Sequence, residues 1–303
     1  MILGIGTINL DHIIDCRHLP APKESILCKN VTLMLGGKGA NQIAAAGRLG
    51  AKTMFISMIG EHDPNNEILF DDLKWAGVNT DYISTVPNMP SGSAFVCVEE
   101  SGQNIVIIHA AANAAITPAV VDKNKRCFEL ADICMTEFAV PIETCEYAMK
   151  LAKKNGKTTI VNPAPYADIS QAFYRYMDIV TPNEIEASDF CGFPVADEKS
   201  ASEACAFFHS KGVKNVVITM GSQGVFVSDG RETLMLPCHK VNAIDTSGAG
   251  DSFNGAFAYA CSMKKDIFTA ARFGNAAASI SVQKKGTARS MPTLREVESV
   301  FRF

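Results

Sequence analysis

One segment near the C-terminal end combines small residues with a single carboxylate. Residues 245–257 read DTSGAGDSFNGAF, so glycines and other small residues lead into an apolar helix. Glycines let the backbone approach a ligand, and the first free N–H groups of the helix, on Gly248, Ala249 and Gly250, then form a predicted anion site. Asp251 at this terminus has two open interpretations. It is a helix cap, which the position alone favours, or a base beside a phosphoryl group.

Two polar motifs near the N-terminus suit a ligand with several hydroxyl groups. Asn9 and Asp11 follow the first predicted strand, and an amide with a carboxylate can bind adjacent hydroxyls, although Asn-x-Asp alone also occurs in ordinary turns. Residues 36–42 (GGKGANQ) form a glycine-rich turn before a helix, which indicates close backbone approach. The P-loop spacing is absent, and Asn9 stands where a dinucleotide motif starting at Gly4 and Gly6 needs a third glycine.

The elements that must position these residues alternate along the chain. Short β-branched runs precede longer helical stretches, which predicts one α/β domain over residues 1–303, with a doubly wound, mostly parallel sheet and helices on both faces. The expected strands are residues 2–7, 53–59, 131–135, 158–161, 178–181 and 215–219. The expected helices are residues 40–49, 64–75, 118–129, 141–155, 199–211, 251–263 and 266–285, the last with Asp266 as N-cap and Gly286 just beyond its end.

Two stretches do not follow this alternation. Residues 13–35 and 94–109 have the pattern of antiparallel strand pairs, the second turning at residues 99–102. Neighbouring positions are all apolar in residues 105–108, so both faces of that strand need cover. Either the hairpin packs on its own domain, or it belongs to a lid with substrate below and a second copy of the chain above. We favour the lid, inserted at about residues 12–35 and 90–110, and hence a homodimer joined through the lids.

The overall composition narrows the function classes. Hydrophobic residues make up 47% of the chain and the net charge is −4, which favours a folded enzyme-like domain and disfavours nucleic acid as a partner. The ten cysteines and six histidines lack zinc-ligand spacing, and no G-x-S-x-G motif of a serine hydrolase occurs. With no long apolar span and no basic leader, no membrane partner is expected and a cytoplasmic location is predicted.

Residues 245–257 and 36–42 match the C-terminal and N-terminal signatures of the ribokinase-like (PfkB) family of carbohydrate kinases, and the chain resembles that family over nearly its whole length. The resemblance implies that Asp251 is the base that activates a sugar hydroxyl toward the γ-phosphate of ATP, while the anion site stabilises the transferred phosphoryl group. It implies that the sugar is held by Asn9, Asp11, Gly37, Lys38, Gly39, Ala40, Asn41 and Asp251.

The resemblance also implies where the nucleotide and the ions bind. The expected ATP-binding residues are Asn183, Glu186, Thr219, Met220, Gly221, Ser222, Gln223, Gly224, Gly250 and Asn275. Of these, Asn183 and Glu186 belong to an Asn-x-x-Glu motif that holds Mg²⁺ largely through water, although the motif by itself is a routine helix start. Potassium is expected, mostly through backbone carbonyls, at Asp245, Ser247, Ser281, Lys284, Gly286 and Ser290.

The substrate prediction depends on one departure from the family pattern. Residues 108–114 and 162–165 are similar to those of the ribose-phosphorylating members, which implies transfer to the 5-hydroxyl of D-ribose. Those members usually carry a sugar-contacting Glu two residues before Pro141, where this chain has Ala139, with Glu137 nearby. A nucleoside kinase, or a kinase of another small furanose, therefore stays an alternative. A sugar-binding regulator without catalysis is a third, against which the retained Asp251 argues.

Overall fold

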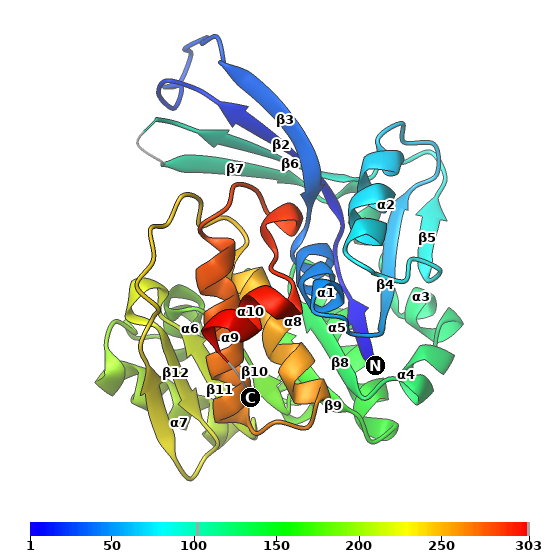
Figure 1. Cartoon of the computed structure of the whole chain (residues 1–303). Helices are drawn as coiled ribbons and strands as arrows, with labels where there is room; N and C mark the ends of the chain where they lie inside the picture. Colours follow the sequence, from blue (N-terminus) through cyan, green and yellow to red (C-terminus); the bar gives the residue numbers. More distant parts are fainter. Residues whose placement is uncertain (101–102, 302–303) are drawn as a thin grey trace.

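A computed structural model describes residues 1–100 and 103–301. Among these residues, nine strands form the main sheet in the order β13-β12-β11-β10-β9-β8-β1-β4-β5 (Figure 1). They are β1 (Ile2–Ile5), β4 (Thr53–Gly60), β5 (Ile83–Val86), β8 (Ile133–Glu137), β9 (Thr158–Asn162), β10 (Ile179–Val180), β11 (Asn215–Thr219), β12 (Val225–Ser228) and β13 (Thr233–Leu236). The strands from β5 to β11 run parallel, whereas β12 runs antiparallel to both of its neighbours, β11 and β13. The predicted mostly parallel α/β sheet is therefore confirmed.

Helices cover both faces of this sheet, because parallel strands joined by crossovers are buried on both sides. The helices are α1 (Lys38–Arg48), α2 (Asn66–Trp75), α3 (Pro118–Lys123), α4 (Arg126–Leu130), α5 (Ile142–Lys154), α6 (Glu184–Cys191), α7 (Glu198–Lys211), α8 (Ala249–Ser262), α9 (Ile267–Ser281) and α10 (Leu294–Val300). Helices α1, α2, α8, α9 and α10 contribute to one apolar layer, and α3, α4, α5 and α7 contribute to the other.

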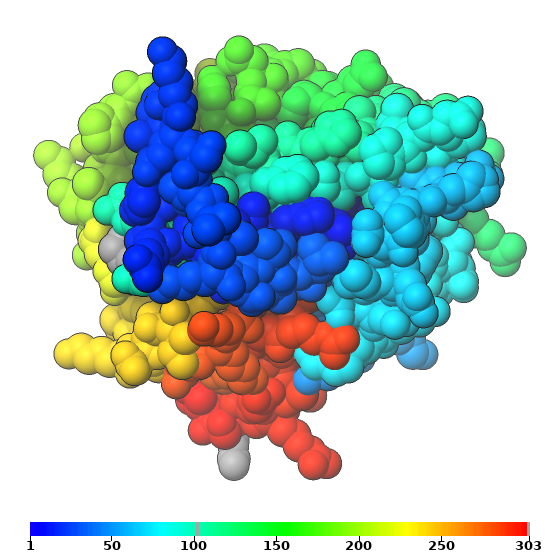
Figure 2. Space-filling model, turned by 90° about the horizontal axis from the view of Figure 1, so that it is seen from above, coloured from blue at the N-terminus to red at the C-terminus, as the bar shows by residue number. Residues whose placement is uncertain are grey.

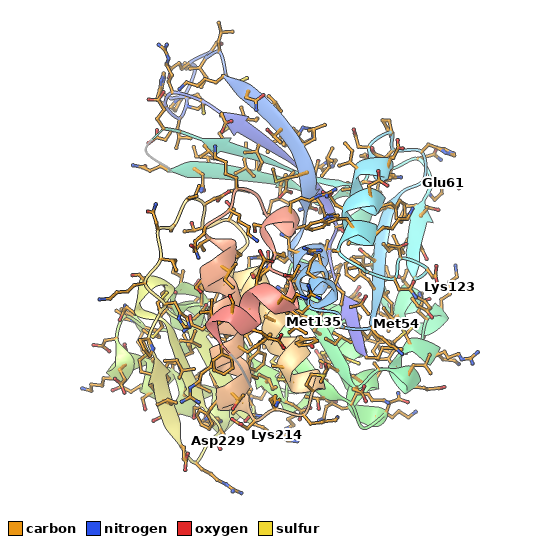
Figure 3. The ribbon with its side chains drawn as sticks, in the orientation of Figure 1. Met54, Glu61, Lys123, Met135, Lys214 and Asp229 are labelled. Atoms are coloured by element: carbon orange, nitrogen blue, oxygen red, sulfur yellow. The ribbon has the colours of Figure 1, made fainter. Side chains whose placement is uncertain are left out.

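The two layers follow from alternation along the strands, since successive side chains point to opposite faces. Met54 on β4 belongs to the layer with α5 and α7, whereas Met135 on β8 belongs to the layer with α1 and α8 (Figure 3). Lys214 and Asp229 lie at the end of the sheet farthest from the smaller sheet (Figure 3). Lys214 there forms an ion pair with Asp178, 2.9 Å between Nζ and Oδ1.

A smaller four-stranded sheet, here called the upper sheet, has the order β3-β2-β6-β7. Its strands are β2 (Asn9–Asp15), β3 (Asn30–Gly36), β6 (Gly92–Val98) and β7 (Asn104–His109). Seen from above, the first strands of this sheet cross the molecule between its cyan-to-green part and the orange and red C-terminal segments (Figure 2). Asn9 and Asp11 lie inside β2, not in a turn after the first strand, because β2 starts at Asn9.

At some places the local expectations differ from the structure. Strands β5, β12 and β13 were not predicted, and the helix expected over residues 118–129 is divided into α3 and α4. Asp266 does cap α9, but the helix ends at Ser281 and not near Gly286. The chain leaves the helix there, and the carbonyl of Val282 accepts from the N–H groups of Ile244 and Asp245. The turn predicted at residues 99–102 includes Ser101 and Gly102, which lie outside the described residues. No helix in the described part of the chain is long and apolar enough to cross a membrane.

Candidate active site

The site lies where the strand order of the main sheet reverses. From β1 the chain moves outward to β4 and β5 and then returns to β8 on the other side of β1. The crevice at the carboxyl end of such a strand is the usual ligand site of an open α/β sheet. Here the carbonyl of Thr7, just after β1, accepts a hydrogen bond from Ala40 N–H at 2.9 Å, which holds the glycine-rich turn against this strand end.

Asp251 does not cap its helix. Gly248 is the N-cap of α8 with φ 71°, a left-handed conformation that favours glycine, and no side chain caps this helix. The Asp251 carboxylate instead accepts from Asn41 Nδ2 at 3.0 Å and from Gln42 Nε2 at 3.1 Å. Burial raises the pKa of Asp251, while Lys38 and these two amides oppose the rise. The structure therefore brings both signature segments together on one carboxylate.

The N-terminus of α8 faces a cleft that is lined by most of the residues expected to bind the nucleotide. Ala249 and Gly250 line this cleft, and the backbone of Gly250 is exposed. Ala249 N–H donates to Thr246 O at 3.2 Å, so this predicted anion donor already has a partner in the protein. A phosphoryl group that uses it must compete with that long bond, whereas the open end of the helix at Gly250 meets the cleft directly.

Asn9 is oriented by a residue that the sequence analysis did not include in the site. Asn113 Nδ2 donates to Asn9 Oδ1 at 2.8 Å and to Ile8 O at 2.9 Å, and Asn113 Oδ1 accepts from Ile8 N at 2.9 Å. Since the carbonyl oxygen of the Asn9 side chain is bound by Asn113, its Nδ2 group remains available as a donor to a ligand. Asn113 lies in the segment 108–114, which resembles the family, but no local sequence signal predicts its contact with Asn9.

Two buried acceptors mark the place of a polar ligand. Within the described residues, Asp11 Oδ1 and Asn41 Oδ1 are buried without a hydrogen-bond partner. Their residues are 8% and 4% exposed, and a buried acceptor left unpaired costs about 1–3 kcal/mol. Burial, together with the charge of Asp251, raises the pKa of Asp11 to about 7. Hydroxyl groups can donate to both oxygens, so these atoms fit a polyol.

Glu137 does not replace the missing carboxylate at Ala139. Its Oε1 accepts from Thr7 N–H and Thr7 Oγ1, both at 2.7 Å, and its Oε2 accepts from Ala139 N–H at 2.7 Å. The side chain is fully buried, which raises its pKa, while these bonds and Lys38 oppose the rise. Glu137 therefore holds the backbone at the carboxyl ends of β1 and β8.

The predicted nucleotide residues surround one cleft of about 670 Å³. The predicted residues that line it are Asn183, Thr219, Gly221, Ser222, Gln223, Gly224, Gly250 and Asn275. Met220 and Glu186 do not line it, because the Met220 side chain is buried in the core beneath the loop and the Glu186 carboxylate belongs to the cap of α6. Much of the wall that sequence analysis missed comes from residues 237–243, including His239, and from Val282. Apart from His239 and Lys240, the lining residues of these segments are small or apolar, and they match no polar motif.

The proposed magnesium motif forms a helix cap in the structure. Asn183 Oδ1 accepts from Glu186 N–H at 2.7 Å, and Glu186 Oε2 accepts from Asn183 N–H at 2.9 Å. Burial raises the pKa of Glu186, with Lys38 and Asp251 acting on it in opposite directions, so this carboxylate lies near the reacting groups. No cluster of three or more His, Cys, Asp or Glu side chains that could hold a metal occurs in residues 1–100 and 103–301. A site with few protein ligands is consistent with Mg²⁺, because this ion keeps several of its water ligands.

The expected potassium residues lie on two segments tied together by Asp245. Its Oδ1 accepts from Ser247 N–H and its Oδ2 from Gly286 N–H, each at 2.9 Å. The Lys284 ammonium is turned away, with Nζ 2.6 Å from Glu296 Oε1, so only the carbonyl of Lys284 can face an ion. The Asp245 carboxylate, together with backbone carbonyl groups of the two segments that it joins, fits a monovalent cation, which takes oxygen ligands.

Comparisons with known proteins show the family of the chain. Residues 1–294 match the pfkB family of carbohydrate kinases, and the chain belongs to this family. Within it, the chain is similar to ribokinases: it is 40% identical to that of Haemophilus influenzae over 292 residues (96% of this chain, 95% of that one) and 36% identical to that of Staphylococcus aureus over 301 residues (99% of each). The structure of Arabidopsis thaliana ribokinase complexed with ribose and ATP aligns with a TM-score of 0.93 at 32% identity, covering 100% of this chain and 98% of that one.

Proposed function

We propose that the chain is an ATP-dependent kinase that transfers the γ-phosphoryl group to the 5-hydroxyl of D-ribose. One observation carries the proposal: Asn41, whose buried Oδ1 has no partner, donates through its Nδ2 to Asp251, and the charge of Asp251 acts on Asp11, whose buried Oδ1 also has no partner. Ribokinases at 36–40% identity over the full length, and the ribose and ATP complex of the Arabidopsis protein, support ribose as substrate and ATP as phosphoryl donor.

Each group of the site then has a chemical task. Asn9 donates to, and Asp11 and Asn41 accept from, the hydroxyls of the sugar. Asp251 accepts the proton of the attacking hydroxyl, and the open N-terminus of α8 at Gly250 stabilises charge on the transferred oxygens. Lys38, whose charge lowers the pKa of Asp251, Glu137 and Glu186, balances the acidic residues around the reaction. The attacking and leaving oxygens lie in line in such a transfer.

Two ions complete the proposal. Mg²⁺, when bound with ATP, neutralises phosphate charge. Glu186 and Asn183 hold it through water. Potassium fits behind the turn that leads into α8, held by Asp245, Ser247 and carbonyls of the segment from Ser281 to Ser290. There Asp245 fixes the direction of the backbone from which the anion donors of α8 project.

A substrate panel tests this function. D-ribose, 2-deoxyribose, other small furanoses and nucleosides are compared by coupled detection of ADP with Mg²⁺ present, in potassium or in a bulky organic cation at equal ionic strength. We expect the highest kcat/KM with D-ribose and a higher rate in potassium. Preference for a nucleoside overturns the substrate assignment, and an equal rate in both cations overturns the potassium site. If no acceptor in the panel gives ADP release, the kinase function is overturned.

The outer face of the upper sheet supports a homodimer. Strand register places Leu33, Phe95 and Ile107 in one row and Val31 and Ile105 in the next, on the face opposite to Asp11. These side chains are 39% to 63% exposed, so the hairpin does not pack on its own domain. A sheet face of this kind is covered well by the same face of a second copy, through a two-fold axis.

The dimer is tested by replacing the centre of this face. We expect the unmodified chain to sediment as a dimer at micromolar concentration, and Ile107→Lys to sediment as a monomer because it buries a charge in the interface. Lys74→Glu, on the exposed surface of α2, is the control and keeps the dimer. A monomeric unmodified chain contradicts the assignment.

A further inference from the structure

Four buried polar side chains connect Asp251 back to its own helix turn. Gln42 Nε2 donates to Asp251 Oδ1 at 3.1 Å and to Asn162 Oδ1 at 3.0 Å. Asn162 Nδ2 donates to Thr181 O at 2.8 Å, and Thr181 Oγ1 donates to Asn254 Oδ1 at 2.5 Å. Asn254 Nδ2 finally donates to Gly250 O at 2.9 Å, one residue before Asp251. Together these bonds form a closed ring, here called the amide ring.

Each donor in the amide ring has an identified acceptor. Gln42 uses both hydrogens of its amide, one on the base and one on Asn162, so its orientation is fixed by two acceptors. Thr181 takes part twice, since its carbonyl accepts from Asn162 and its hydroxyl donates to Asn254. Gln42, Asn162, Thr181 and Asn254 are 1%, 8%, 1% and 3% exposed, so water competes little for these bonds.

The ring joins elements that are far apart in the sequence. Gln42 lies on α1, Asn162 at the end of β9, Thr181 just after β10 and Asn254 on α8. Gly255 lets α1 and α8 approach, because a Cβ there would lie 2.3 Å from the carbonyl oxygen of Gln42 and 2.5 Å from the Cβ of Ala45. The contact between the helices is thus what brings Gln42 within reach of Asp251.

We propose that Gln42, Asn162, Thr181 and Asn254 are positioning residues that act as one unit, fixing the carboxylate of Asp251 together with the turn at Gly250. The inference rests on the proposed kinase function and adds to it the residues that set the geometry of the base. Because a hydroxyl that attacks a phosphoryl group must be aligned with both the base and the anion donors, a ring that fixes both at once acts on turnover and not on substrate affinity.

The first test removes one hydroxyl that contacts neither substrate nor base. Thr181→Val keeps the shape and breaks the bond to Asn254, and we expect kcat to fall by about tenfold with the KM of sugar and ATP changed by less than about twofold. Thr181→Ser keeps the hydroxyl and restores turnover. The control is Thr159→Val, toward the other end of β9, where the hydroxyl donates to Tyr176 O at 2.6 Å and accepts from Asp178 N–H at 2.8 Å; because Thr159 lies outside the amide ring, its loss should leave kcat unchanged.

The second test uses the pH profile, which a purely structural role does not move. The Gln42 amide lowers the pKa of Asp251, so Gln42→Met, which removes that donor, raises the pKa of the base. A base with a higher pKa stays protonated to a higher pH, so the acidic limb of kcat against pH should move upward. Thr181→Val, which is not bound to Asp251, should move this limb less than Gln42→Met does.

The outcomes separate the ring from the function. If the unmodified chain phosphorylates no sugar or nucleoside, the kinase function has failed. If it is active and Thr181→Val matches Thr181→Ser in turnover, only the ring is overturned. Should Thr181→Val not fold, Gln42→Met decides alone, and an unmoved acidic limb overturns the ring. The double variant Thr181→Val/Gln42→Met gives a further test. If its fold-loss in kcat equals the product of the two single fold-losses, the residues do not act as one unit.

Discussion

The two halves of the active site are built differently. The sugar half is made of buried side chains whose polar atoms are fixed by other side chains, as Asn113 fixes Asn9 and as Asn41 holds Asp251. The nucleotide half is lined by small residues, exposed loop backbone and apolar side chains, such as Gly221, Gly224 and Val282. The sugar half should therefore be sensitive to the loss of single atoms, and the nucleotide half tolerant, because backbone groups survive side-chain substitution.

The largest effect is expected at Asp251, where the halves meet. Asp251→Asn keeps the shape but removes the proton acceptor, so kcat should fall by about 10²-fold or more while ATP still binds. Turnover is measured by ADP release and ATP binding by calorimetry. Near-normal turnover in this variant would contradict the role of Asp251 as the base.

The next effect should separate the halves. Asn113→Asp replaces the donor to Asn9 Oδ1 with an acceptor, which turns the Asn9 amide over and presents its oxygen to the sugar. We expect the KM of D-ribose to rise by about tenfold, or roughly 1.4 kcal/mol, with the KM of ATP within about twofold. Asn155→Asp, on a helix end where the amide contacts only Leu151 O, is the control. Equal changes in both KM values would show that the halves are not independent.

Asp11 gives an effect that depends on pH. Its pKa in the folded protein is about 7 against an ordinary value of 3.8, so folding binds a proton between these values and the ionised group destabilises the ligand-free protein above about pH 7. Asp11→Asn should therefore raise the free energy of unfolding on the order of 2–4 kcal/mol at pH 8 and much less at pH 4, while weakening ribose binding. Urea unfolding at both pH values measures this. A gain that is equal at pH 4 and pH 8 would contradict the raised pKa.

The smallest effect is expected in the nucleotide half. His239 lines the cleft, and within residues 1–100 and 103–301 no hydrogen bond fixes its ring as Asn113 fixes Asn9. His239→Ala should change the KM of ATP by less than about threefold, since most contacting side chains carry little of the binding free energy. Steady-state kinetics with varied ATP provides the measurement, and a tenfold rise would show that this half also depends on single side chains.

Several features were predictable from the sequence because their signals are local. The alternation of β-branched runs and helical stretches determines a mostly parallel α/β sheet, and the small residues before α8 determine an open helix N-terminus. The two signature segments identified the family, and they predict Asp251 as the reacting carboxylate. The short strands β5, β12 and β13 and the early end of α9 were missed, because short strands and the last turn of a helix have weak local signals.

The tertiary structure alone decided how Asp251 is used. Its position at a helix start favoured a cap, yet Asn41 and Gln42, more than 200 residues earlier, bind both of its oxygens. Glu137 likewise stood near a departure from the family pattern, and only folding turned it toward Thr7 and the backbone of Ala139. Turns and helical or strand periodicity depend on residues that are close in the sequence. A buried amide, in contrast, forms its hydrogen bonds only when elements distant in the sequence pack together. The sequence therefore determined the kind of reaction, and the packing of α1 against α8 and the strand ends determined which side chains hold the reacting groups.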